Sequence, residues 1–183
     1  MSITAEAQGV LDFWLAETPA EKRFARDAAL DAAIAARFGG LHARLSEAVP
    51  EDWVATARGL LAAVIVLDQF SRNLFRDDGR AFAQDGVALG LTKAALARGD
   101  LERLDATEQQ FLLLPLMHSE VLADQDRMVA EAARLGLGDV VDFARRHREA
   151  IARFGRFPAR NAALGRVSTA AEVAFLRDNP DGF

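Results

Sequence analysis

Apolar residues recur along this chain every three or four positions, which is the period of an amphipathic α-helix. Runs of β-branched residues alternating with polar ones, typical of strands, are absent. The segment Gly59–Leu67 is apolar on all sides, which predicts a central buried helix. The pattern therefore predicts an all-α protein, a single-domain array of about eight or nine helices with short connections over residues 1–183.

Capping and breaking residues place the first helices. Thr4 is a typical N-cap for the first helix, and Pro19 ends it. Gly39 and Gly40 are expected to end the second helix, with a short continuation after them. A third helix is expected to begin near Thr56.

The second half of the chain gives comparable signals. A fourth helix is expected over Asp85–Ala97, and a long fifth one begins after an N-cap at Thr107. Pro115 kinks this helix or splits it in two, because proline removes a backbone hydrogen bond. Two further helices are expected over Asp139–Phe154 and Ala170–Arg177.

Composition excludes several classes of function. No apolar run approaches the roughly 18 residues of a membrane span, and the N-terminus lacks a signal-peptide pattern, so we expect a cytoplasmic protein without membrane contact. There is no cysteine. The net charge of −5 and the low lysine content argue against nucleic-acid binding. Three scattered histidines and no phosphate-loop or dinucleotide glycine pattern predict neither a metal site nor a cofactor.

One basic segment stands out on this acidic chain. Arg145 to Arg166 holds seven Arg and one Glu, a local charge of +6, so the remainder carries −11. A helix end at Gly155 followed by an arginine-rich turn suits a carboxylate or phosphate ligand. The alternative is that the turn docks onto the protein's own carboxylates, such as Glu120 and Asp124.

Three predicted helices carry polar groups in the middle of an apolar stripe. Buried polar groups need partners, because leaving one unpaired costs about 1–3 kcal/mol. If the three stripes converge, their polar groups form one buried network close to the basic segment. Such a network is either a binding site or a structural polar core that fixes helix register. Its expected members are Asp68 and Arg72 on the third helix, His118 and Gln125 on the fifth, and His147 on the sixth.

Three long motifs give the chain a resemblance to a known family. LDQFSRNLFR, PLMHSEVLADQ and HREAIARFGRFPARNAALGR, together with VLDFWL and RFGGLH, resemble the bacterial DUF924 family over nearly the whole chain. The resemblance implies a tetratricopeptide-like array of antiparallel helix pairs but supplies no reaction. Two positions depart from the family pattern: Ser71 stands where a proline is usual, and Leu114 where a tyrosine is common.

These observations leave three readings of function open. The first is a pocket for a small anionic metabolite, with or without catalysis. The second is a helical-repeat module that grips an acidic peptide or a C-terminal carboxylate. The third is that the motif residues are scaffold only. The candidates for catalysis are His118, His147, Asp68 and Glu120. The candidates for ligand binding are Arg72, Asn73, Gln125, Arg153, Arg156, Arg160, Asn161 and Arg166.

Overall fold

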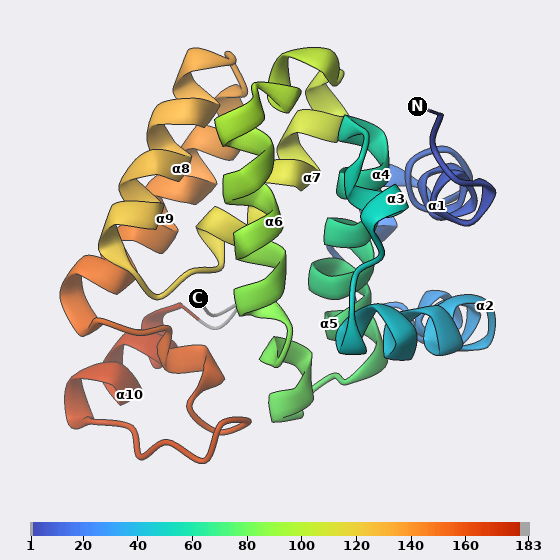
Figure 1. Cartoon of the computed structure of the whole chain (residues 1–183). Coiled ribbons are helices and arrows are strands. Elements are labelled where there is room, and N and C mark those ends of the chain that lie inside the picture. The colour runs from blue at the N-terminus through green and yellow to red at the C-terminus, as the bar shows by residue number, and fades with distance from the viewer. Residues whose placement is uncertain (1, 180–183) are drawn as a thin grey trace. The chain divides into compact units, whose positions relative to one another are not determined.

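The computed structural model describes residues 2–179, and within these residues the secondary structure is helical throughout, without a strand (Figure 1). The prediction of an all-α fold is thus confirmed. Two four-residue helices, α3 (Glu51–Val54) and α5 (Ser71–Leu74), accompany the longer ones. The longer α-helices are α1 (Ala5–Leu11), α2 (Ala28–Glu47), α4 (Ala57–Val64), α6 (Asp85–Arg98), α7 (Ala106–Met117), α8 (Leu122–Arg134), α9 (Gly138–Phe154) and α10 (Ala170–Asp178).

The chain divides into two compact units, which we describe separately. The first unit runs to Arg76 and resumes over Arg80–Pro115. The second comprises Asp77–Gly79 and the chain from Leu116 onward. The tetratricopeptide-like arrangement of helix pairs stays a prediction.

The first unit is built around the segment that the sequence marks as apolar on all sides. Helix α4 and the π-helical turn Ile65–Phe70 that continues it are buried along their whole length. Aromatic side chains from distant parts of the chain pack against this segment. The Trp14 ring meets Phe70 edge to face at 5.4 Å and Phe111 at 5.9 Å. A large buried aromatic core therefore fixes the helices of this unit.

The second unit begins with an antiparallel hairpin of α8 and α9, which lie side by side (Figure 1). Their connection turns at Gly136, whose φ of 69° is the left-handed conformation that favours glycine. A small apolar cluster of Ile151 on α9, Phe157 and Phe175 joins α9, the arginine-rich turn (residues 156–166) and α10. The Thr169 hydroxyl caps α10 and Glu172 completes a capping box, so the predicted start of this helix is confirmed.

Two predicted boundaries are wrong. Helix α2 passes through Gly39 and Gly40 without interruption, because Leu41 and Leu45 continue its buried face and burial outweighs the poor helix propensity of glycine. Helix α7 begins at Ala106 rather than after Thr107. Its first turn is closed by Asp105 and Glu108, whose side chains accept each other's backbone N–H at 2.9 and 3.2 Å.

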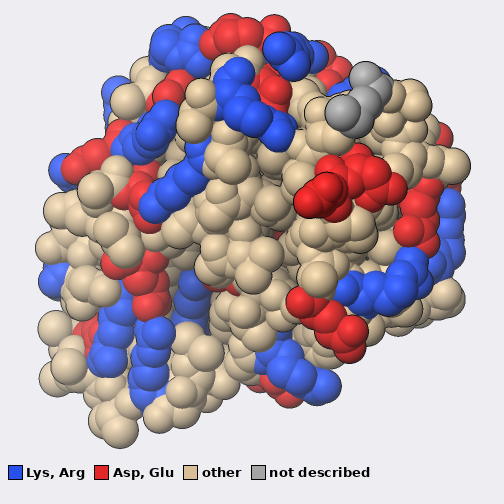
Figure 2. Space-filling view, viewed as in Figure 1, with Lys and Arg blue, Asp and Glu red and all other residues tan. Residues whose placement is uncertain are grey.

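Pro115 lies inside α7, and the long fifth helix is interrupted only beyond Met117, before α8 begins at Leu122. The predicted fifth helix is therefore two helices, but the prediction that Pro115 splits it is wrong, because the break lies at residues 118–121. His118 is consequently not on the helical stripe that the sequence spacing predicts. None of the described helices is both long and apolar enough to cross a membrane. Acidic and basic side chains are interspersed over the face drawn in Figure 2.

Candidate anion-binding site

The break between α7 and α8 is held by a single buried amide. Nε2 of Gln125 donates to the carbonyl oxygens of Leu116, Met117 and Ser119, at 3.3, 2.7 and 2.6 Å. Carbonyls at a helix C-terminus have no partner within the helix, so this amide satisfies the end of α7. The Gln125 side chain is fully buried. Because only its amide nitrogen can donate hydrogen bonds, these bonds determine which way the amide group is turned.

The Ser119 side chain makes two hydrogen bonds that fix the loop before α8. Its hydroxyl donates to the Asp124 carboxylate at 2.8 Å and accepts the Val121 N–H at 3.2 Å. His118 and Glu120 flank this serine. Both are therefore presented from an irregular loop whose backbone is fixed on each side, which is the usual way in which a rigid scaffold positions functional side chains.

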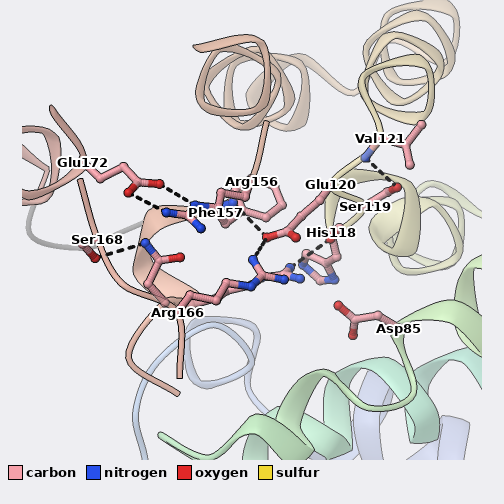
Figure 3. Close-up of polar contacts among 12 residues, drawn as sticks. Asp85, His118, Ser119, Glu120, Val121, Arg156, Phe157, Arg166, Ser168 and Glu172 are labelled. Atoms are coloured by element: carbon pink, nitrogen blue, oxygen red, sulfur yellow. Dashed lines mark hydrogen bonds and ion pairs between the residues drawn. The ribbon is translucent and has the colours of Figure 1, made fainter. Parts of the chain in front are cut away.

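The Glu120 carboxylate lies against the arginine-rich turn (Figure 3). One of its oxygens accepts the Phe157 N–H at 2.9 Å and Nη1 of Arg166 at 2.8 Å. Burial raises the pKa of Glu120, but the bonds from Arg166 and Phe157 and the charge of Arg160 outweigh it and hold this pKa below its ordinary value. The turn thus docks onto one of the carboxylates that the sequence suggests.

Arg156 and Glu172 form a bidentate pair, with Nε to Oε1 at 2.6 Å and Nη2 to Oε2 at 2.8 Å (Figure 3). Nη2 of Arg156 also donates to the Val167 carbonyl at 2.9 Å. The pair with Arg156, together with the Thr169 N–H, lowers the pKa of Glu172 to about 2. Arg156, a candidate ligand-binding residue, therefore ties α10 to the turn.

His147 presents a defined tautomer. Its Nδ1 lies 2.9 Å from the Phe143 carbonyl oxygen, which can only accept, so Nδ1 carries the proton and Nε2 carries the lone pair. Burial lowers the pKa of His147 to about 4. His118, Arg160 and Arg146 add to this lowering, and the hydrogen bond to Phe143 opposes it. The imidazole is therefore neutral at pH 7.

Arg160 joins the two histidines. Its Nη2 donates to the His118 carbonyl at 3.0 Å, and its guanidinium lies 4.7 Å from the centre of the Phe157 ring. The His147 ring meets the same phenyl ring edge to face at 5.6 Å. Arg160 thus binds the main chain at His118 and shares the Phe157 ring with His147, and we refer to His118, His147 and Arg160 as the His–Arg cluster.

The remaining candidates of this region have different surroundings. Arg153 is exposed, and its guanidinium stacks over Phe154 at 4.8 Å. Asn161 is buried and donates from Nδ2 to the Ser168 hydroxyl at 3.0 Å, which supports the turn from inside. Neither side chain is brought into the His–Arg cluster by a contact that the structure shows.

The first unit holds a separate polar group. Nη1 and Nη2 of Arg72 bind the Asp85 carboxylate at 2.9 and 3.2 Å, and Nη1 lies 3.5 Å from the fully buried Asp68 carboxylate. Burial lowers the pKa of Arg72, but Asp68 and Asp85 raise it above its ordinary value. Gln69 donates to Asp68 at 2.5 Å. The predicted Asp68–Arg72 pair therefore exists, with an added partner in Asp85.

Two further polar contacts of the first unit involve residues that sequence spacing did not select. Asp31 accepts Nδ2 of Asn73 at 2.8 Å and pairs with Arg76. Nε2 of His42 lies 2.8 Å from the Ser71 hydroxyl, which donates to the Leu67 carbonyl at 2.6 Å. The serine hydrogen is directed at a backbone oxygen, so this histidine is not set to activate it as a nucleophile.

The predicted site residues therefore fall into two sets. Asp68, Arg72 and Asn73 belong to the first unit, whereas the other candidates belong to the second. Within the second unit the structure brings His118 and His147 together and adds Arg160. The single network that would join both sets stays a prediction. No set of three or more His, Asp and Glu side chains within residues 2–179 is arranged to hold a metal ion.

Fold and geometry define an all-helical protein with an arginine-rich turn beside two histidines. The chain belongs to the DUF924 family, described as bacterial protein of unknown function, whose model matches residues 10–180. A solved structure of a protein of unknown function from Agrobacterium tumefaciens is similar, with 34% identity and a TM-score of 0.91. The similarity covers 97% of this chain and 99% of that one. No curated protein sequence matches the chain.

Proposed function

We propose that this protein binds a small anionic metabolite, carrying a carboxylate or phosphate group, at the His–Arg cluster. The observation that supports it is electrostatic. The guanidinium groups of Arg160 and Arg146 both lower the pKa of His147, as does the neighbouring His118. A partly buried concentration of positive charge is stabilised by an anion, because the charges are only weakly screened there.

The two ion pairs of the turn support the same proposal. Arg166 with Glu120 and Arg156 with Glu172 fix the backbone on both sides of Phe157. Arg160 lies in this fixed stretch, with its guanidinium stacked on the Phe157 ring. A guanidinium that is already positioned loses little conformational entropy when it binds a ligand, so the arrangement favours affinity.

A thermal-shift panel tests the proposal. The panel contains sulfate, phosphate, sugar phosphates, and mono- and dicarboxylates. A ligand at 100 times its dissociation constant adds about 2.7 kcal/mol to the free energy of unfolding. For a chain of this size, that raises the melting temperature by roughly 5–10 °C. We expect at least one selective hit among these anions.

Matched variants locate the site. Arg160→Gln should abolish the ligand-induced shift, and Arg145→Gln should keep it. Arg145 lies on α9 and forms an exposed pair with Asp142 at 3.3 Å. Each variant removes one positive charge. An equal loss in both variants would mean that the shift reports net charge rather than this site. A flat panel for the unmodified protein would overturn the proposal and favour the peptide-binding reading.

A further inference from the structure

We draw no further inference here: the strongest candidate, the surface cluster in the first unit made by the half-buried guanidinium of Arg23 and the exposed ring of the adjacent Phe24, already uses its charge to bind the Leu15 and Thr18 carbonyls, and nothing in the part of the chain that the structure describes shows what would cover it.

Discussion

Replacing the Gln125 amide tests what stabilises the loop that carries His118 and Glu120. We consider Gln125→Met, which keeps the length of the side chain and removes the donor. The Leu116 carbonyl keeps a second bond, from the Ser119 N–H at 3.3 Å, so the loss falls mainly on the carbonyls of Met117 and Ser119. A buried acceptor without a partner costs about 1–3 kcal/mol, so two of them predict a loss of about 2–6 kcal/mol.

Urea unfolding measures this loss as a lower transition midpoint at unchanged slope. Gln109→Met is the matched control. Gln109 donates from Nε2 to one carbonyl, that of Leu101, at 3.1 Å, so its replacement should cost only about 1 kcal/mol. If Gln125→Met costs no more than Gln109→Met, then the amide does not hold the end of α7 and the reasoning is refuted.

Three further predictions concern backbone and pH. Gly40→Ala should stabilise the protein by about 0.4–1 kcal/mol, because a Cβ at this position of α2 meets nothing within 4 Å. Gly59→Ala should destabilise the protein, because its Cβ would lie 2.4 Å from the Trp53 carbonyl oxygen, and thermal unfolding of the two variants measures both effects. The pKa of His147 is about 4 in the folded protein and about 6.5 in the unfolded chain, so the unfolded chain takes up a proton first and the free energy of unfolding falls by at most about 3 kcal/mol between pH 6.5 and pH 4. His147→Asn should remove this part of the pH dependence of stability. Glu172 has a pKa of about 2 against an ordinary 4.5, so its stabilising effect is complete above pH 4.5 and is lost as pH falls towards 2; unfolding at graded pH should show less of this loss in Glu172→Gln.

Local chemistry made much of the fold predictable. Thr4, Thr56 and Thr169 each cap the helix that follows, because a side-chain oxygen beside three free N–H groups is favourable in almost any context. Continuation through Gly39 and Gly40 was not predictable in the same way. It depends on what the far half of α2 packs against, and tertiary burial outweighs local propensity.

The candidate site was predictable in its residues but not in its geometry. A continuous helix would place His118 and Gln125 on one face, but the chain leaves the helix at residue 118 and the Gln125 amide closes the end that this creates. The partners of Arg72 show the same limit. Asp85 is 13 positions away and on another helix, so no helical spacing could have selected it.

The arginine-rich turn docks onto the protein's own carboxylates, and this docking does not conflict with the anion site that we propose. Arg156 and Arg166 bind the protein's own Glu172 and Glu120, so these two charges are neutralised and the turn is fixed. Arg160 lies between them in sequence and is stacked on Phe157 beside the histidines. Because the turn is fixed, the Arg160 guanidinium stays against Phe157, next to the His147 ring. The structural pairs are therefore a condition for the proposed anion site rather than evidence against it.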